Sequence, residues 1–297
     1  MTISSSSKIL TYIAPAKVNL SLQIGNKRAD GYHELASIVG FTEFGDHLTL
    51  EISNADQLRL LGMFSTNITT PTSKNLVMKA IHTLRNHNFD IPPLRITIDK
   101  QIPVGGGLGG GSSDAATIFL ALNDIFNLNL TKSYLENIAL QVGADVPVCL
   151  NRDFVTMRGI GERVTVISPS TKPTYVVLTN PNFIMSTKTV FEEFDKEPLE
   201  SILKRPLENW SIEQLLAGGN SLEKPAIKIY PQIGILLNTM KSLYSSNKRE
   251  GLSSVQMSGS GAGCFALFDD AEKANMFCRK IQGAGYWAVS TKFISNF

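Results

Sequence analysis

The sequence predicts an α+β protein of two lobes with a cleft between them, and three observations support this. Apolar residues at every second position, as in residues 18–24 and 94–98, predict strands. Apolar residues three and four positions apart, as in residues 77–84, predict helices. The pattern starts anew near residue 156. We therefore expect an N-terminal lobe over residues 1–155 and a C-terminal lobe over residues 156–297.

The first lobe is expected to contain three strands and three helices. Ser73 is the expected N-cap of its first helix, and Gly143 is expected to end its last one. The strands are expected over residues 18–24, 47–52 and 94–100, and the helices over residues 73–86, 113–126 and 131–142. The apolar stripes of these helices are Val77, Ala80, Ile81 and Leu84; Ala115, Ile118, Phe119, Leu122, Ile125 and Phe126; and Leu135, Ile138, Ala139 and Val142.

The second lobe is expected to begin and end with strands. Its strands are predicted over residues 164–167, 175–179, 264–268 and 288–294, and its helices near residues 212–216 and 233–244. A polar stretch with Pro198 and Pro206 joins the early strands to these helices.

The composition is that of an ordinary globular protein. The 297 residues are 43% hydrophobic and 18% charged, with a net charge of +2. So weak a charge draws the chain to neither nucleic acid nor an anionic membrane, so an anionic ligand must be held by a local site. The N-terminus lacks the pattern of a secretion signal, and no apolar run approaches the ~20 residues that span a bilayer. We expect a cytoplasmic protein with neither nucleic acid nor a membrane as its partner, and the oligomeric state stays open.

The three cysteines and four histidines indicate neither a disulfide framework nor a zinc site. The cysteines lie far apart in the sequence, are odd in number and form no C-x-x-C pair. Reduced thiols are the expected state.

A glycine-rich segment, PVGGGLGGGSSDAA at Pro103–Ala116, lies between a predicted strand and a predicted helix. Glycines let the backbone approach a ligand closely, and the helix N-terminus adds unpaired amide donors, so the segment suits phosphate groups. The spacing G-x-G-x-x-G at 105–110 also occurs in dinucleotide folds, but Asp124, at about the required distance, falls inside a helix. No Gly-Lys-Ser/Thr closes a Walker A loop. A tight connection without a ligand is the remaining alternative.

Four further residues carry reactive or ring-bearing side chains, and each has an ordinary alternative. Lys17 shares the polar face of its strand with Asn19, where most lysines are solvated. Asp145 follows a helix-ending glycine, where aspartates commonly cap turns. A lysine beside Asp145 would keep that carboxylate ionised and stabilise a phosphoryl group in transfer. Tyr32 and His33 follow an Asp-Gly turn signal and suit a nucleobase, although they could simply begin a strand.

Together these segments resemble the GHMP small-molecule kinase superfamily, which includes galactokinase, homoserine kinase and mevalonate kinase. Three motifs carry the resemblance: PAKVNLSL with RADGYHEL at Pro15–Leu35, PVGGGLGGGSSDAA, and GADVPV at Gly143–Val148. The segments RGIGE, PNFIMSTKTVF and MSGSGAGCFALF add weaker support, so the resemblance spans nearly the whole chain. The doubled triple glycine with ADGYHEL resembles the member that phosphorylates a cytidine-diphosphate alcohol in non-mevalonate isoprenoid precursor biosynthesis.

The resemblance implies a two-lobed GHMP kinase-like fold with the active site in the cleft. It also implies that the lobe of residues 1–155 binds ATP and that the lobe of residues 156–297 lies on the substrate side. The lysine of PAK and the aspartate of GADVP, here Lys17 and Asp145, are implied to be the catalytic pair. The resemblance also implies that Tyr32 and His33 hold the cytosine ring from one side and that Phe191 stacks on the other. On the sequence alone, Phe191 could equally be a residue of the hydrophobic core.

ATP and Mg²⁺ are implied as cofactors, with direct in-line phosphoryl transfer and no phosphoenzyme. Asn19 and Lys100 fall at matching positions near the phosphates and the nucleotide, and Ser113 is a candidate contact for Mg²⁺. The loop residues implied to hold ATP are Pro103, Val104, Gly105, Gly106, Gly107, Leu108, Gly109, Gly110, Gly111, Ser112 and Ser113. Residues 258–263 form either a second glycine loop that faces the substrate's diphosphate or a flexible turn.

One motif departs from the family pattern. The family has an Asn-Asp-x-Glu stretch before its late helix, and this chain has Asn220, Ser221, Leu222 and Glu223. The change puts a secondary contact or a local cap in doubt, not the catalytic base. Two alternatives stay open: a superfamily kinase for a different alcohol, and a catalytically silent relative that senses nucleotide.

Overall fold

The computed structural model describes residues 9–68, 71–168, 175–196, 218–245 and 255–294. The chain divides into two compact units, and each takes its residues from several segments. The first unit consists of residues 1–15, 45–104 and 110–150, and the second of residues 16–44, 105–109 and 151–297. The α+β class is confirmed. The assignment of ATP to residues 1–155 and of the substrate to residues 156–297 stays a prediction.

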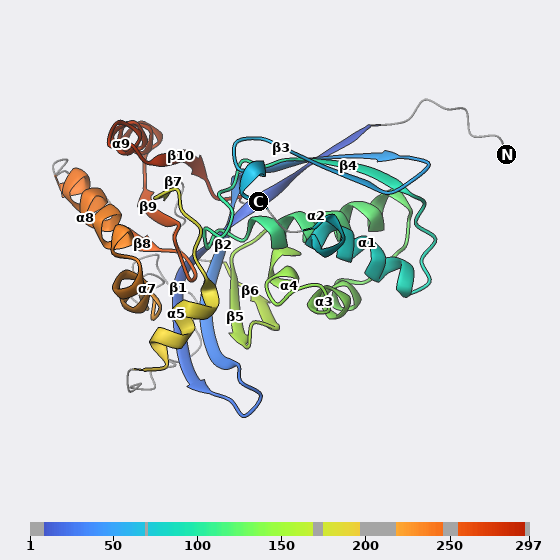
Figure 1. The fold of residues 1–297 in the computed structure, drawn as a ribbon, viewed down its shortest axis with the longest axis horizontal. Helices are drawn as coiled ribbons and strands as arrows, with labels where there is room; N and C mark the ends of the chain where they lie inside the picture. The colour runs from blue at the N-terminus through green and yellow to red at the C-terminus, as the bar shows by residue number, and fades with distance from the viewer. Residues whose placement is uncertain (1–8, 69–70, 169–174, 197–217, 246–254, 295–297) are drawn as a thin grey trace. The chain divides into compact units, whose positions relative to one another are not determined.

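Two long strands contribute to both units (Figure 1): β1 (Leu10–Lys27) and β2 (His33–Ile52). In the first unit, the end of β2 pairs antiparallel with β4 (Leu94–Asp99), and β4 pairs parallel with β3 (Gln57–Leu61). Helices of this unit pack on one another, as expected from their apolar stripes. They are α1 (Leu76–Asn86), α2 (Gly110–Ile125), α3 (Lys132–Leu140) and α4 (Val146–Cys149), with short 3-10 turns at Ser65–Asn67 and Thr72–Lys74.

Two details of these helices differ from the sequence prediction. The cap of α1 is Asn75, whose side chain accepts a hydrogen bond from the Val77 amide, because Ser73 belongs to the preceding 3-10 turn. Helix α2 begins at Gly110, inside the glycine-rich segment, and its residues 113–119 are buried without interruption, whereas Gly111 in the first turn is exposed. The predicted apolar stripe of this helix includes only part of its buried surface, since Ser113 and Asp114 are buried as well.

The second unit contains the beginning of β2, which pairs with β5 (Val155–Gly159), and β5 pairs with β6 (Arg163–Val166). A separate sheet has the order β10-β7-β9-β8, and helices α8 and α9 contact it (Figure 1). Its strands are β7 (Tyr175–Asn180), β8 (Val255–Met257), β9 (Cys264–Phe268) and β10 (Trp287–Lys292). The helices are α5 (Thr187–Phe194), α7 (Glu223–Ile229), α8 (Pro231–Ser245) and α9 (Ala271–Gly283). The expected helix near residues 212–216, with Pro198 and Pro206, lies outside the described residues.

Strand β1 is buried on both faces where it crosses the second unit. The predicted apolar face is confirmed, because Val18 and Leu20 are fully buried. The opposite face is buried too, with Lys17 at 4% and Asn19 at 2% exposure. A solvated lysine, the ordinary alternative for Lys17, is therefore wrong.

In the described part of the chain no helix has the length and apolar character that crossing a membrane requires. The same residues contain no group of three or more His, Cys, Asp or Glu side chains placed to hold a metal ion. The three cysteines are free and buried.

Candidate active site

The glycine-rich segment divides between the units. Residues 105–109 belong to the second unit, and residues 110–113 form the first turn of α2 in the first. Gly105, Gly107 and Gly109 have φ of +65°, +66° and +70°, a backbone conformation that residues with a Cβ rarely adopt. These backbone angles explain why the segment needs glycine at every second position.

A second glycine loop, residues 258–263, packs against residues 105–109 within the second unit. The Gly263 amide donates to the Gly106 carbonyl at 2.8 Å, and the Ser258 hydroxyl donates to the Gly107 carbonyl at 3.0 Å. A Cβ on Gly107 would lie 2.2 Å from the Ser258 carbonyl oxygen, so the close approach of the two loops itself requires glycine. The structure thus adds a packing reason for glycines that the sequence alone associates with phosphate.

Lys17 and Asn19 lie beside these two loops. The Lys17 amide donates to the Leu108 carbonyl at 2.8 Å, and a Cβ on Gly109 would lie 2.9 Å from the Cβ of Lys17. The Asn19 amide donates to the Ser258 hydroxyl at 3.0 Å, and the Asn19 side chain donates to Ser37 at 2.7 Å. Among the described residues, no group donates to the buried Oδ1 of Asn19. A buried acceptor without a donor is a polar atom that a ligand can satisfy.

In the first unit, Lys100 lies in a buried ion cluster with Asp46 and Asp114. Its ammonium contacts both carboxylates, at 2.7 Å for Asp114, and the Asp46 carboxylate also accepts from the Gln101 and Ile102 amides. Burial lowers the pKa of Lys100, but the charges of Asp114 and Asp46 outweigh it and raise the pKa. Burial raises the pKa of Asp114 to about 7, with Lys100 opposing the shift and Asp46 adding to it. The contact of Lys100, the residue after β4, with Asp114 of α2 thus joins the two ends of the loop between these elements.

Two predicted site residues of the first unit lie at helix starts. Ser113 is fully buried in the first turn of α2, and in the described chain its hydroxyl has no hydrogen-bond partner. Asp145 is half-buried and precedes α4 without capping it through its side chain. Asp145 nevertheless lies in a turn at the N-cap position of α4, so its ordinary alternative, a turn or cap aspartate, stays open. Lys17 belongs to the second unit and Asp145 to the first, and their catalytic pairing stays a prediction.

The second unit brings His33 and Phe191 together, although they are far apart in the sequence. Their ring centroids lie 5.3 Å apart at an interplanar angle of 34°, and Phe194 meets the imidazole edge-on at 5.9 Å. Asp195, which the sequence analysis missed, contacts His33 Nε2 at 2.7 Å. The only sequence signal for Asp195 is its spacing, because it lies one helical turn after Phe191.

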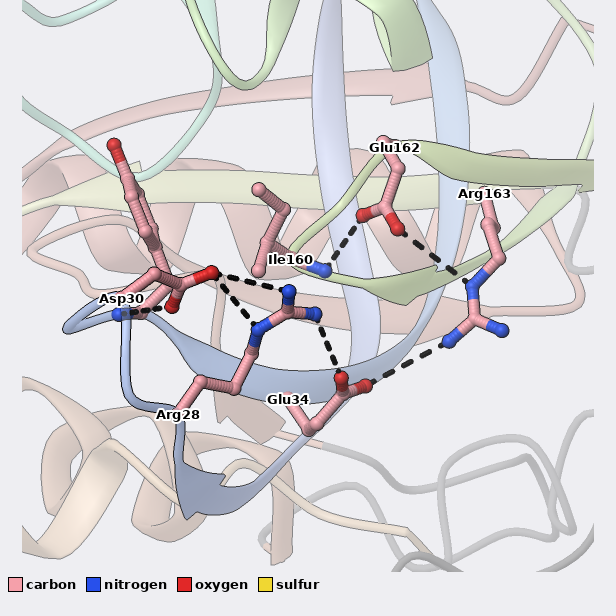
Figure 2. A network of polar contacts seen from close by, with 7 residues as sticks. Arg28, Asp30, Glu34, Ile160, Glu162 and Arg163 are labelled. Carbon is pink, nitrogen blue, oxygen red and sulfur yellow. Dashed lines mark hydrogen bonds and ion pairs between the residues drawn. The ribbon is translucent and has the colours of Figure 1, made fainter.

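A network of exposed charged residues holds the turn between β1 and β2, where Tyr32 lies (Figure 2). The Tyr32 amide donates to Asp30 at 3.1 Å, and the Tyr32 side chain is exposed. Arg28 pairs with Asp30 at 3.0 Å and with Glu34 at 2.9 Å. Arg163 of β6 extends the network to Glu34 at 3.7 Å. The turn that contains Tyr32 and precedes His33 is therefore linked by ion pairs to the start of β6.

The structure shows what Ser221 contacts at the position where the family pattern has aspartate. The Ser221 hydroxyl accepts a hydrogen bond from the Ile24 amide at 3.1 Å, and the Ser221 amide donates to the Leu22 carbonyl. Serine therefore binds β1 through both its backbone and its side chain. Glu223, the last residue of the stretch, accepts from the Met257 amide at 3.0 Å.

Comparisons with known proteins define the class. Two protein-family models match the chain. The model described as "GHMP kinases N terminal domain" matches residues 75–152, and the one described as "GHMP kinases C terminal" matches residues 199–286. The crystal structure of a homoserine kinase from Cytophaga hutchinsonii has a TM-score of 0.69 at 18% identity, over 100% of this chain and 98% of that one. The chain has the fold and the domains of a GHMP kinase.

Nearer relatives identify the family within that class. The 4-diphosphocytidyl-2-C-methyl-D-erythritol kinase of Rhizobium meliloti is 34% identical over 94% of this chain and 93% of its own length. The protein of the same name from Chelativorans sp. is 38% identical over 89% of both chains. A crystal structure of 4-(cytidine 5'-diphospho)-2C-methyl-D-erythritol kinase has a TM-score of 0.79 at 30% identity, over 97% of this chain and all of the other. The chain belongs to the 4-diphosphocytidyl-2-C-methyl-D-erythritol kinase family.

Proposed function

We propose that this protein transfers the γ-phosphoryl group of ATP to the 2-hydroxyl of 4-diphosphocytidyl-2-C-methyl-D-erythritol. The observation that carries the substrate is the contact of His33 with Phe191 beside the turn of Tyr32. A partly buried aromatic ring next to a hydrogen-bonding imidazole suits a nucleobase, which needs both stacking and edge contacts. Family membership supports the same substrate.

The residues of the glycine-rich segment fit ATP. The Oδ1 of Asn19 and the hydroxyl of Ser113 are buried and lack a protein donor or acceptor among the described residues, as expected for atoms that contact a ligand. The first turn of α2 presents unpaired amides and the positive end of a helix dipole. Mg²⁺ bound to the ATP oxygens would neutralise phosphate charge, with Ser113 as its candidate protein contact. Lys100 is proposed to support the nucleotide site through α2, since its ammonium is already held by Asp46 and Asp114.

The proposed chemistry is an in-line transfer without a phosphoenzyme. Asp145 would accept or orient the proton of the substrate hydroxyl, and Lys17 would stabilise charge on the phosphoryl group in transfer. Burial of Lys17 favours this role, because a charge excluded from water interacts more strongly with a phosphate. The cytoplasmic location expected from the sequence stays a prediction.

The test is phosphorus NMR of ATP and Mg²⁺ with the protein and a panel of alcohols. The panel contains the cytidine-diphosphate alcohol, its uridine counterpart, homoserine, mevalonate and galactose. We expect ADP and a new phosphomonoester signal with the cytidine alcohol. Transfer to another alcohol alone would indicate a different superfamily kinase. ATP binding without ADP formation on any alcohol would indicate a nucleotide sensor.

Two aspartate-to-asparagine variants locate the base in the same assay. Asp145→Asn should lower kcat by about 10²–10⁴-fold, the usual cost of removing a positioned general base. Asp90→Asn changes an exposed loop carboxylate and serves as the matched control. Lys17→Ala should lose a comparable factor, and the double variant should be little worse than the poorer single one. If the two losses multiply, Lys17 and Asp145 act independently.

A further inference from the structure

The imidazole of His33 is held on three sides by the last turn of α5 and the residue after it. The Phe191 ring lies 5.3 Å away at a tilt of 34°, Phe194 meets the imidazole edge-on, and Asp195 Oδ1 lies 2.7 Å from Nε2. The Asp195 amide donates to the Phe191 carbonyl, so the two residues are one helical turn apart. The Phe191 ring and the Asp195 carboxylate therefore lie on the same side of the helix. The His33 side chain is only 6% exposed. Its orientation is therefore set by these contacts and not by solvent.

The carboxylate of Asp195 is itself held in its ionised form. Lys27 donates to Oδ2 at 2.5 Å, and this hydrogen bond together with that of His33 lowers the pKa of Asp195 against the opposing effect of burial. An ionised carboxylate only accepts hydrogen bonds. The Nε2 of His33 must therefore carry a hydrogen, and in the neutral ring Nδ1 is then an acceptor. In the part of the chain that the structure describes, no residue binds this second nitrogen.

From this geometry we propose that Asp195 is a positioning residue that makes His33 Nδ1 a hydrogen-bond acceptor and thereby selects cytosine over uracil. The inference rests on the proposed function, which puts the base beside His33. Cytosine presents an exocyclic amino group, which donates, at the position where uracil presents a carbonyl oxygen, which accepts. An acceptor at Nδ1 accepts a hydrogen bond from the amino group of cytosine. The same acceptor repels the lone pairs of the uracil carbonyl oxygen. The carboxylate thus selects the base without contact with it.

An amide at position 195 reverses the hydrogen bond. In Asp195→Asn the side chain keeps its shape, and its amino group can donate to Nε2, which moves the ring proton to Nδ1. An equivalent change in the Ser-His-Asp triad of chymotrypsin-like proteases leaves the geometry intact and fixes the wrong tautomer. Asp195→Ala instead removes the partner and leaves both tautomers accessible. Glu192→Gln makes the same chemical change on α5 at an exposed residue, whose one ion pair within the described residues is with Lys188 at 3.7 Å, and it is the matched control.

The first experiment is titration calorimetry of CDP and UDP into the four proteins, with the adenine nucleotide site filled by saturating ADP. We expect the wild-type protein and Glu192→Gln to prefer CDP. In Asp195→Asn the ratio of the two Kd values should fall by about tenfold or more, the size of one hydrogen bond gained or lost. Asp195→Ala should weaken both ligands with a smaller change in the ratio. An Asp195→Asn protein that keeps the wild-type ratio would overturn the proposal, as would a wild-type protein without preference.

The second experiment needs no ligand and no activity. Nitrogen-15 NMR of the imidazole rings should place the His33 proton on Nε2 in the wild-type protein and on Nδ1 in Asp195→Asn, with His33→Gln to assign the signals among the four histidines. A proton on Nδ1 in the wild-type protein would overturn the inference. If both experiments succeed and the cytidine alcohol is not phosphorylated, the proposed function fails while the role of Asp195 stands.

Discussion

Each unit contains a cluster of oppositely charged residues close to the predicted ligand contacts, and the two clusters differ in burial. In the first unit, Lys100 and its partners Asp46 and Asp114 are at most 5% exposed. In the second, the side chains of Arg28, its partners and Arg163 are 34–66% exposed (Figure 2).

Ion pairs of the same chemical kind should therefore have different effects in the two clusters. Buried charges must be paired, because an uncompensated charge in the interior is costly, so the first cluster should govern the stability of its unit. Exposed pairs are screened by water and salt, so the network of Figure 2 should restrain the turn of Tyr32 and His33 without adding much stability.

The largest expected effect is on Lys100. Lys100→Met leaves two buried carboxylates without their cation, and breaking a buried pair in this way typically costs about 3–5 kcal/mol. Urea unfolding should report this loss, with Lys79→Met, an exposed position on α1, as the control. If Lys100→Met instead keeps its stability and loses only ATP binding, Lys100 is a direct nucleotide contact and not a structural cation.

The next effect is a pH dependence from Asp114. Its folded-state pKa of about 7 lies above the ordinary value of 3.8, so the folded protein holds a proton that the unfolded chain releases. This group therefore favours folding at low pH, and its contribution declines as the pH rises through the window from about 4 to 7.

Asp114→Asn should remove that part of the pH dependence. The measurement is the free energy of unfolding of both proteins at a series of pH values, and the variant should lose less stability than the wild type across the window. Identical slopes would show that Asp114 stays ionised beside Lys100 throughout.

A smaller effect is expected in the exposed network. Arg28→Ala removes the contacts to Asp30 and Glu34 at the base of the turn. Thermal melts should shift only slightly and the difference should vanish at high salt. The KM for the cytidine alcohol should rise by less than about tenfold, with the KM for ATP unchanged. A loss of stability comparable to that of Lys100→Met would remove the distinction between the two clusters.

The smallest effect is expected for Arg163. Its side chain is 66% exposed, and its pairs with Glu34 and Glu162 are both 3.7 Å long. Arg163→Ala should therefore leave melting temperature and both KM values unchanged within error. A clear rise in the KM for the cytidine alcohol would instead show that the ion-pair link between β6 and the turn that contains Tyr32 positions Tyr32 and His33.

Local periodicity was sufficient for most secondary structure. Alternation at Val18–Ile24 and Leu94–Ile98 predicted parts of β1 and β4, and the apolar spacing at Val77–Leu84 predicted α1. These patterns work because the side-chain period of a strand or helix is fixed by its backbone. The N-cap of α1 was missed by two residues, since Ser73 and Asn75 are both good caps and only the 3-10 turn before the helix separates them.

The sequence by itself determined the fold class, the glycine-rich segment and the motifs that carry the family, because each is written in neighbouring residues. The tertiary structure alone decided which polar groups are buried and which residues meet. The polar face of β1 is buried because segments far along the chain cover it, and in one of them the Ser258 hydroxyl accepts a hydrogen bond from the Asn19 amide. Asp195 reaches His33 across 162 residues of sequence. Periodicity specifies which face of an element is apolar, but the partner of a polar side chain depends on packing between distant segments, which no local pattern records.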